Sequence, residues 1–404
     1  MKEFLLFFLF LFCSLAVNGE EWNQFRGPGG LGISKQKIST SWNQDSVIWK
    51  TKLPGLGQSS ISYAKGRLFL SAGSKGGNHR VLLCYNEKNG RLIWKREIKY
   101  KGVENIHRMN GWATPTPATF GNRVVAFFGP AGLHCFDLDG NKMWSLDLGD
   151  FPGNWGVAAS PIIYNGIVYQ NCDSMGPSRI VAISLTSGQI LWETQRVEKP
   201  RGGWSTPIVI QSGNRIQLAL NGEFGIRGYD LKNGKELWFC RGFNGRGSPV
   251  PFFLDDMVFV VNGKPGDLYA VSTLGQGDVT KTQLKWHSRR NGGRDLPSPA
   301  VIDGIVLVTS MSGVITAYDA ENGKTLWIDR LYGAFSGSPL IANNLYYLQS
   351  ENGSTYVINP NQKKLEILSV NELTKESSEV FRATLSPIGG KIFTRSLTTL
   401  YCIH

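Results

Sequence analysis

Short apolar runs recur along the whole chain, and turns containing glycine, asparagine or aspartate separate them. A tryptophan stands near the end of seven of these runs, at intervals of 41 to 50 residues: Trp49, Trp94, Trp144, Trp192, Trp238, Trp286 and Trp327. Most of these runs follow a turn such as Asn89-Gly90 or Asn322-Gly323, in which glycine adopts the positive φ that a tight hairpin needs. The pattern predicts many short strands joined by hairpins.

A second marker keeps the same interval. Ser-Pro or Thr-Pro begins another apolar run at Thr116, Ser160, Thr206, Ser248, Ser298, Ser338 and Ser386, and Ser60-Ile61 holds the equivalent place in the first unit. Proline suits the start of a strand, where no ladder donor is needed. Each unit therefore contains strand, turn, strand, loop, strand, turn and strand. Four-stranded units of 40 to 50 residues are typical of β-propeller blades.

Counting these markers predicts an eight-bladed, all-β propeller of four-stranded blades over residues 47–404, folded as one domain. The last unit, residues 384–404, holds only three strands, so we expect the strand around Trp49 to complete it and close the ring. The seventh unit has no tryptophan, and we expect Ile367 or Leu368 to fill that position. The fifth unit has a longer last turn, at residues 275–278.

The composition agrees with this fold. Glycine accounts for 48 of 404 residues, well above the usual share of about 7%. Charged residues make up only 18% of the chain, and aromatic residues reach 11%. Strands and tight turns favour this combination, and a hydrophobic share of 41% excludes a disordered chain.

The first nineteen residues have the features of a secretory signal peptide. Lys2 precedes an apolar run that continues to Val17, and small residues follow at Ala16 and Gly19. We place cleavage after Gly19 and expect export to the periplasm or the extracellular space. Residues 20–46 then form an N-terminal segment before the propeller. The five cysteines beyond the signal peptide include no CxxC pair, and most take small-residue positions in strands, so we expect them to be buried.

The repeat resembles the tryptophan-docking motif of quinoprotein-type β-propellers, also called PQQ-like after pyrroloquinoline quinone. The clearest copy runs from Ala317 to Trp327, and another from Gly228 to Trp238. The resemblance covers residues 22–404. The stretch WNQFRGP at residues 22–28 is similar to the mature start of exported PQQ-like propellers of planctomycete-type bacteria.

This resemblance implies two kinds of relative. Quinoprotein dehydrogenases hold PQQ and Ca²⁺ at the propeller axis, and the alcohol-type enzymes use a disulfide between adjacent cysteines and an aspartate base. This sequence has no adjacent cysteines, and no motif marks that aspartate. The other relative is the non-catalytic propeller subunit of the outer-membrane β-barrel assembly machinery, which binds protein partners. The chain is similar to it in length and number of blades.

The segments before the first strand of each blade carry the candidate site. Because the repeat is in register, they converge on one face around the axial mouth. The candidate residues for a ligand or partner are Trp112, Asn154, Trp155, Trp204, Asn244, Arg246, Arg294, Asp295 and Arg382. Aromatic faces and guanidinium groups suit a planar or anionic ligand. The alternative is that these side chains only pack and hydrogen-bond the loops.

We therefore expect an exported, non-catalytic binding or scaffold propeller of the bacterial cell envelope or exterior. Its axial face would bind a protein, a glycan or a small molecule, with no metal and no cofactor, and the protein would be a monomer with peripheral association to the envelope. The alternative is a PQQ-dependent oxidoreductase with Ca²⁺, in which Asp295 is the available carboxylate. A weaker alternative is a glycan-processing enzyme that pairs Glu223 with Asp295.

The charge of the chain changes this picture little. Lys and Arg number 43 against 31 Asp and Glu, a formal net charge of +12. No block of five or more like charges occurs, and the positive charges are scattered along the chain. Nucleic-acid binding needs a continuous basic stripe, so we expect no nucleic acid as a partner.

Overall fold

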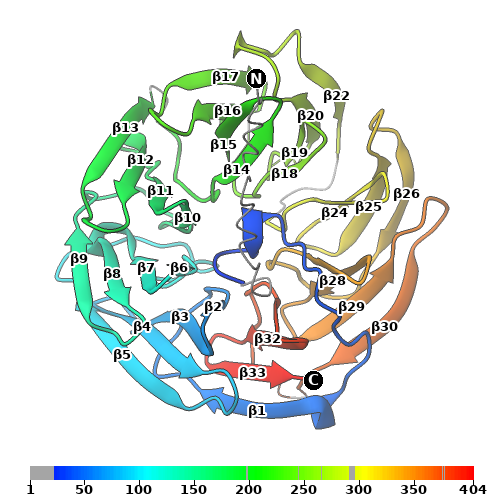
Figure 1. Ribbon diagram of the computed structural model, residues 1–404. Coiled ribbons are helices and arrows are strands. Elements are labelled where there is room, and N and C mark those ends of the chain that lie inside the picture. Colours follow the sequence, from blue (N-terminus) through cyan, green and yellow to red (C-terminus); the bar gives the residue numbers. More distant parts are fainter. Residues whose placement is uncertain are drawn as a thin grey trace, which may run out of the picture.

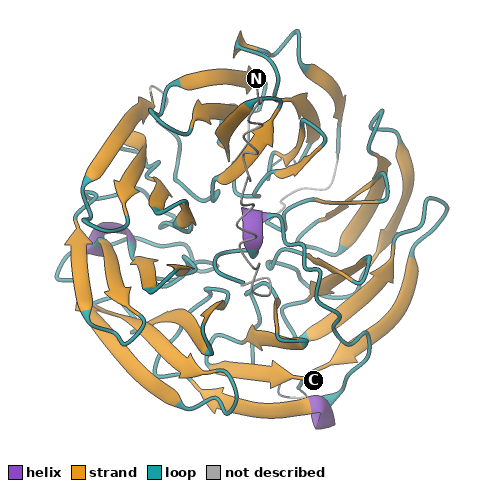
Figure 2. Ribbon diagram, in the orientation of Figure 1, coloured by secondary structure: helices purple, strands orange, loops and turns teal. Residues whose placement is uncertain are grey.

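Eight antiparallel sheets stand around a central axis in the computed structural model (Figure 1). The structure describes residues 22–196, 199–243, 245–264, 266–290, 296–374, 376 and 378–404. In seven sheets the strand that comes first in the chain lies nearest the axis and the last lies at the perimeter, whereas in the eighth sheet the first strand of the chain lies at the perimeter. Strands make up most of the regular structure, with short 3-10 helices at η1 (Pro28–Gly30), η2 (Gln44–Ser46) and η3 (Gly129–Ala131) (Figure 2). The predicted eight-bladed, all-β propeller is confirmed.

The first four blades follow one another along the chain. Their strands are β2 (Ser62–Ala64), β3 (Arg67–Gly73), β4 (His79–Asn86) and β5 (Leu92–Lys99); β6 (Ala118–Phe120), β7 (Arg123–Phe127), β8 (Leu133–Asp137) and β9 (Lys142–Leu146); β10 (Ile162–Tyr164), β11 (Ile167–Asn171), β12 (Ser178–Ser184) and β13 (Ile190–Arg196); and β14 (Ile208–Ser212), β15 (Arg215–Asn221), β16 (Gly225–Asp230) and β17 (Glu236–Arg241).

The next four blades complete the circle. Their strands are β18 (Phe252–Leu254), β19 (Met257–Val261), β20 (Leu268–Ser272) and β22 (Leu284–Ser288); β23 (Ala300–Ile302), β24 (Ile305–Thr309), β25 (Val314–Asp319) and β26 (Thr325–Arg330); β27 (Leu340–Ala342), β28 (Leu345–Gln349), β29 (Ser354–Asn359) and β30 (Glu366–Glu372); and β31 (Ser386–Ile388), β32 (Lys391–Arg395), β33 (Thr399–Ile403) and β1 (Val47–Lys52).

Strand β1 closes the ring as predicted. It pairs antiparallel with β33 from Val47 opposite Ile403 to Lys52 opposite Thr399, so the two ends of the chain share the eighth blade. Closure leaves no open seam between the first and last blades. The pairing of β1 with β33 therefore joins the start and the end of the propeller, which no covalent connection links.

The repeated tryptophans join neighbouring blades. Trp94 Nε1 donates to the Leu138 carbonyl of the next blade at 2.8 Å, and its ring rests on Gly140. A Cβ at Gly140 would come within 2.8 Å of the ring, and this residue has a φ of 85°. Glycine is thus needed both for the turn and for the tryptophan that packs on it. The same bond to the next blade is made by Trp49, Trp144, Trp192, Trp286 and Trp327.

The seam between blades seven and eight corrects our prediction for the missing tryptophan. In the strand register, the position that tryptophan takes in other blades belongs to Ser369, opposite Val357. Ile367 and Leu368 are exposed instead. A one-residue difference in register puts Leu368 on the opposite face of the strand from Ser369, and a β-bulge between Val357 and Ile358 shifts the pairing at this point.

Trp42 of the N-terminal segment occupies this seam. Its ring is buried and stacks on Tyr347 of blade seven, with the ring centroids 6.5 Å apart and the planes 5° from parallel. Its backbone N–H donates to Asn371 Oδ1 at 3.0 Å. The segment therefore supplies, from another part of the chain, an aromatic ring at the seam where the repeat lacks one.

The long turn of blade five pairs with the outer edge of blade four. Its β21 (Gly277–Asp278) adds a fifth, parallel strand to blade four beside β17. Trp238 of β17 is fully buried and donates to Gln217 Oε1 of its own blade at 2.7 Å, rather than to the next blade.

The N-terminal segment also plugs one end of the axis. The Trp22 carbonyl accepts the Tyr63 N–H of blade one at 2.8 Å, and the Asn23 carbonyl accepts the Thr119 N–H of blade two at 2.7 Å. Ile33 then forms a bridge with Ile341 of blade seven. Figure 1 shows η1 at the centre of the ring. The axial channel is thereby blocked on this face.

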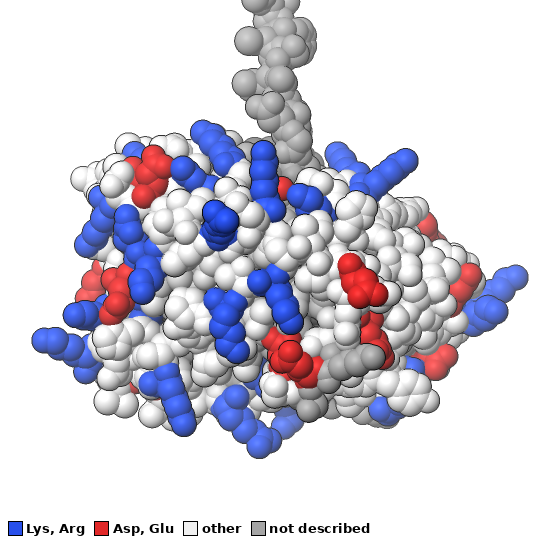
Figure 3. Space-filling model, turned by 90° about the horizontal axis from the view of Figure 1, so that it is seen from below, with Lys and Arg blue, Asp and Glu red and all other residues white. Residues whose placement is uncertain are grey.

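The predicted signal peptide, residues 1–19, lies outside the described residues. Among the helices of the described part of the chain, none is long and apolar enough to cross a bilayer. Lys and Arg side chains spread over the side of the molecule seen in Figure 3, with Asp and Glu between them rather than in a separate zone.

Candidate functional site

A ring of serine and threonine hydroxyls joins the blades close to the axis. The backbone N–H of the Ser or Thr that opens one blade donates to the equivalent hydroxyl of the next blade, at 2.9 to 3.2 Å. Six such bonds are present in the described residues: Ser60 to Thr116, Thr116 to Ser160, Ser160 to Thr206, Ser298 to Ser338, Ser338 to Thr384 and Thr384 to Ser60. Blade five departs, because the Ser248 N–H donates to the Arg246 carbonyl at 2.9 Å.

The loops just before this ring form the axial mouth, on the face opposite the plug. There the Arg246 guanidinium lies 3.8 Å from the centroid of the Trp155 ring, a cation–π contact that reaches from blade five to blade three. The His107 ring also packs on Trp155, with the centroids 4.6 Å apart. Trp204 Nε1 donates to the Gly156 carbonyl at 2.9 Å, so each side chain is held by a neighbouring loop.

A second guanidinium crosses the mouth from the other side. Arg382, before blade eight, donates from Nη1 to the Met109 carbonyl, before blade two, at 3.1 Å. Its Nε lies 3.3 Å from Glu351 Oε1, and Ser336 donates to that same oxygen. Arg382 is therefore a fixed cation, since a carboxylate and a carbonyl hold it in place.

These loops enclose a cavity of about 160 Å³ above the plug, with Phe25 of the plug in its wall. The mouth loops contribute His107, Met109, Asn110, Thr114, Trp155, Ala158, Trp204, Arg246, Leu296, Ser336, Gly337 and Arg382, and the remaining lining residues are Gln58, Ser60, Thr116, Ser160, Ser248, Val250, Ser298, Ser338 and Thr384. The set contains two arginines and no Asp or Glu among the described residues. The described lining is aromatic and rich in hydroxyls, and it contains two guanidinium groups.

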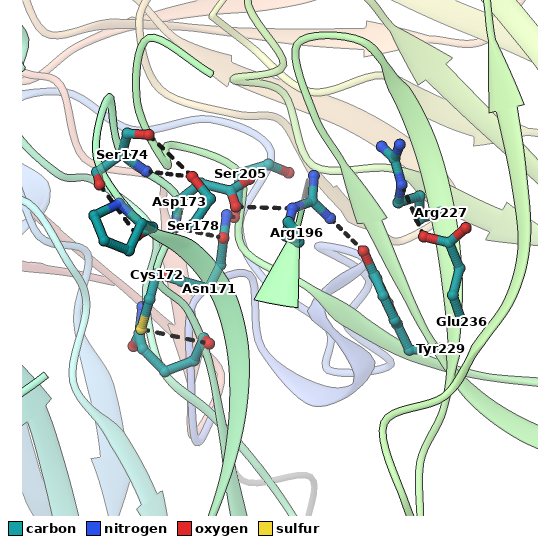
Figure 4. Close-up of polar contacts among 12 residues, drawn as sticks. Asn171, Cys172, Asp173, Ser174, Ser178, Arg196, Ser205, Arg227, Tyr229 and Glu236 are labelled. Carbon is teal, nitrogen blue, oxygen red and sulfur yellow. Dashed lines mark hydrogen bonds and ion pairs between the residues drawn. The ribbon is translucent and has the colours of Figure 1, made fainter. Parts of the chain in front are cut away.

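A buried ion pair supports the loop that carries Trp204. Asp173, after β11, lies 2.8 Å from Arg196 Nε at the end of β13, and both side chains are almost fully buried. Arg196 also donates to the Tyr229 hydroxyl of blade four (Figure 4). Asn171 Nδ2 donates to the Ser205 carbonyl, next to Trp204, at 3.1 Å. The loop between blades three and four is therefore anchored on both sides.

Four of the nine predicted site residues line the cavity: Trp155, Trp204, Arg246 and Arg382. Two lie elsewhere. The Trp112 ring folds back onto Gly77 of blade one, and Asn154 is exposed in a separate groove with Asp150 and Phe151. Asn244, Arg294 and Asp295 lie outside the described residues. Ligand binding by these residues stays a prediction.

The structure adds lining residues that the sequence reasoning missed. Phe25 belongs to the N-terminal segment, which the repeat does not predict at the axis. The repeat markers Thr116, Ser160, Ser298 and Ser338 were interpreted only as strand starts, although their recurrence in register was a signal that their hydroxyls face the axis. Glu223, the candidate partner of Asp295, instead accepts bonds from Arg201, whose Nε lies 2.6 Å from Oε1.

The cysteines take no part in this site. Cys84, Cys135, Cys172, Cys240 and Cys402 are all buried with free thiols. Burial raises the pKa of Cys84 and Cys135 to about 12, so their thiolates are scarce at neutral pH. Within the described residues no group of three or more His, Cys, Asp or Glu side chains is arranged to hold a metal ion.

A family model described as outer membrane protein assembly factor BamB matches residues 35–283 and 277–391. The chain belongs to this family of PQQ-like propellers. The BamB of Burkholderia pseudomallei is 22% identical over 340 residues, which cover 82% of this chain and 81% of that protein. By name, these relatives are outer-membrane assembly factors.

Other relatives are named as enzymes. The tetrathionate hydrolase of Acidithiobacillus ferrooxidans is 23% identical over 284 residues, 50% of this chain and 55% of that protein. The chain thus spans about half the length of that relative. A europium-containing methanol dehydrogenase matches in structure with a TM-score of 0.69 at 11% identity, over 95% of this chain and 98% of that one. At this identity the match shows the fold alone.

Proposed function

We propose that this protein is a non-catalytic binding propeller of the bacterial cell envelope or exterior, and that its axial cavity binds an anionic ligand. The proposal narrows the protein, glycan or small-molecule partner expected at the axial face to a small anion or the anionic group of a larger molecule. The family and its outer-membrane relatives support the envelope location.

One observation carries the proposal. Arg246 and Arg382 both line a cavity whose described walls contain no Asp or Glu. Guanidinium groups bind carboxylates and related oxyanions through charge-assisted hydrogen bonds, which are stronger than neutral ones. Trp155 and Trp204 beside them exclude water, and the lower local dielectric strengthens the attraction.

Binding of simple anions tests the proposal. Acetate, phosphate and sulfate would be titrated into the purified protein at constant ionic strength, with thermal unfolding and tryptophan fluorescence as readouts. A ligand of the folded state raises the unfolding free energy by about 2.7 kcal/mol at a hundredfold excess over its Kd. We expect saturable stabilisation by at least one anion.

A matched pair of variants locates the effect. Arg246→Ala should weaken binding about tenfold or more, because it removes a charged partner from the cavity. Arg241→Ala is the control: its guanidinium also stacks on an aromatic ring, 4.6 Å from Phe239, but it lies on an outer strand. Stabilisation that both variants lose equally, or that neither loses, would contradict binding in the axial cavity.

A tetrathionate hydrolase is the second candidate, favoured by the relatives of that name and by the cationic cavity, since tetrathionate is an anion. His107 would then be the base available in the described lining. Tetrathionate consumption by the protein, lost in His107→Ala, would replace the non-catalytic proposal. Binding of tetrathionate without its consumption would support the non-catalytic proposal.

The PQQ-dependent alternative fits the described residues less well. Calcium takes six to eight oxygen ligands, usually with carboxylates among them. The described lining of the cavity contains no Asp or Glu carboxylate. A tricyclic quinone with three carboxylates is also several times larger than benzene, which fills a cavity of about 150 Å³. If titration with PQQ and Ca²⁺ raised the unfolding temperature in the same assay, the result would support a PQQ-dependent oxidoreductase.

A further inference from the structure

Four hydroxyls that line the cavity, one from each of four consecutive blades, have an O–H donor that no described protein group accepts. Thr384, Ser60, Thr116 and Ser160 each accept a backbone N–H from the preceding blade, and none has a recorded bond through its own O–H. All four line the cavity, and each exposes 2% or less of its surface. Because a buried donor without an acceptor costs free energy, these groups favour a cavity occupant that offers acceptor oxygens.

The four hydroxyls form a continuous arc, since they come from blades eight, one, two and three. On the other side of the ring, Ser338 donates to Ser298 Oγ at 3.0 Å, which leaves the Ser298 O–H as a donor, and the lining includes the apolar Val250 and Leu296. The cavity therefore has a wall of donors facing a wall that is partly apolar. A ligand with oxygens along one end would be oriented by this difference.

The arc and the two arginines lie at different depths. In the mouth loops, Arg382 precedes the ring residue Thr384 by two positions, and Arg246 precedes Val250, whose N–H donates to Ser298 Oγ, by four. Three residues beyond the ring, Tyr63, Thr119 and Ile163 bond to the plug segment. The hydroxyl arc thus lies between the mouth and the plug, so the cavity offers one set of donors at its opening and another near its floor.

The volume limits what can contact both sets. A cavity of about 150 Å³ encloses benzene, and this cavity has about 160 Å³. A ligand of roughly six to ten non-hydrogen atoms would fill it. The chain between its two polar ends must therefore be short if both ends are to lie within the cavity.

On the basis of the anion-binding function proposed above, we propose that the ligand is a short dianion with an oxyanion group at each end. The arginines bind one end at the mouth, and the hydroxyl arc donates to the other end near the plug. Short dicarboxylates and two-ended sulfur oxyanions share this chemistry.

Succinate and butyrate test the two-ended requirement, because they share a four-carbon chain and differ by one carboxylate. Calorimetric titration of the full chain at constant ionic strength should give a Kd for succinate at least tenfold lower than for butyrate. Suberate, with eight carbons, should bind more weakly than succinate. Tetrathionate in the same series separates the two sources: tighter binding than succinate indicates a sulfur oxyanion, and weaker binding indicates a dicarboxylate.

Two isosteric variants distinguish a hydroxyl that contacts the ligand from one that only bonds to the preceding blade. Thr116→Val and Thr206→Val each remove a hydroxyl that accepts an N–H from the preceding blade at 2.9 Å. Only Thr116 lines the cavity. Both variants should lower the Tm by similar amounts, while Thr116→Val alone should weaken succinate binding about tenfold and leave butyrate binding nearly unchanged.

The outcomes distinguish this inference from the function on which it rests. Equal affinity for succinate and butyrate, or equal loss of succinate binding in both threonine variants, would overturn the two-ended ligand and leave anion binding intact. If none of the anions binds, including acetate, phosphate and sulfate, the proposed function fails together with the inference.

Discussion

The perimeter and the axial mouth of this propeller are built from the same repeat in opposite ways. At the perimeter, six tryptophans make the same bond to the next blade, from Trp49 Nε1 to the Glu87 carbonyl and so on around the ring. At the mouth, successive blades present different side chains, such as Trp155, Trp204 and Arg246. Repetition holds the ring together, and the departures from repetition give the cavity its chemistry.

The two regions also differ in how polar groups are satisfied. Each of the six docking tryptophans has a backbone carbonyl as partner, so the perimeter has little left to offer a ligand. At the axis, four buried hydroxyls that line the cavity retain donors, and two guanidinium groups line the same cavity. Changes at the perimeter should therefore act on stability, and changes at the mouth on binding. The following experiments test that separation.

Removing a docking tryptophan should have the largest effect. Trp94→Ala deletes a buried ring that packs on Phe69 and Phe136, and should lower the unfolding free energy by about 4 kcal/mol. Denaturant unfolding measures this loss, and anion affinity of the folded variant should not change. A parallel loss of affinity in folded protein would show that the perimeter and the mouth are coupled.

The seam that Trp42 fills should respond slightly less. Trp42→Ala removes the ring stacked on Tyr347 and should cost about 3 kcal/mol, because the segment that carries it can relax into the space. Limited proteolysis should then cut within residues 38–46 before it cuts the blades. Unchanged protease resistance would mean that the strand pairing of β1 alone holds this seam.

Asp173 links the two regions, since its ion pair lies in the blade but supports a mouth loop. Asp173→Asn leaves Arg196 without its buried counter-ion and should cost about 2 kcal/mol, part of the penalty for breaking a buried pair. Anion affinity should also fall, because the Trp204 loop loses an anchor. If Asp173→Asn lowers stability but leaves anion affinity unchanged, the ion pair stabilises the blade and does not affect the mouth loop.

The smallest effect concerns pH. Burial lowers the pKa of His134 below its usual 6.5, so the unfolded chain takes up a proton at a higher pH than the folded one. The contribution of His134 to stability is therefore present above about pH 6.5 and is lost as the pH falls below it. His134→Gln should flatten the decrease in Tm between pH 7 and pH 5 relative to the unchanged protein.

Glu104 should change the pH dependence of stability in the direction opposite to His134. Its burial raises the carboxyl pKa above 4.5, against the lowering effect of its partner Arg80. The folded state then binds a proton more readily than the unfolded state, and this group lowers stability as the pH rises through that pKa. Glu104→Gln should steepen the loss of Tm on acidification, whereas a flatter profile would contradict the assignment.

Much of the fold could be predicted because each turn carries its own chemistry. The glycine of a turn such as Asn89-Gly90 adopts a φ of 66° and receives the ring of Trp49, so the sequence marks both the hairpin and the seam. In the blade without tryptophan, the prediction that Ile367 or Leu368 takes the tryptophan position is wrong. No local signal places Trp42, which lies far from β30 in sequence, beside that blade.

The candidate site could be predicted only in part. Its location at the loops before each first strand followed from the repeat, and Arg246 and Trp155 do meet there. Trp112 and Asn154 come from equivalent loops before blades two and three but point elsewhere, because Trp112 packs on Gly77 and Asn154 faces solvent. Register places a residue at the mouth, whereas loop conformation decides where its side chain points.

The amino-acid sequence alone determined the number of blades, the four-stranded repeat and the closure of the ring by β1, because these depend on local turns and on periodic apolar residues. Tertiary structure decided what lies at the axis. The plug that carries Phe25 and the Trp42 ring at the blade-seven seam depend on contacts between segments distant in sequence. Such contacts form only when the ring closes, and no local pattern encodes them.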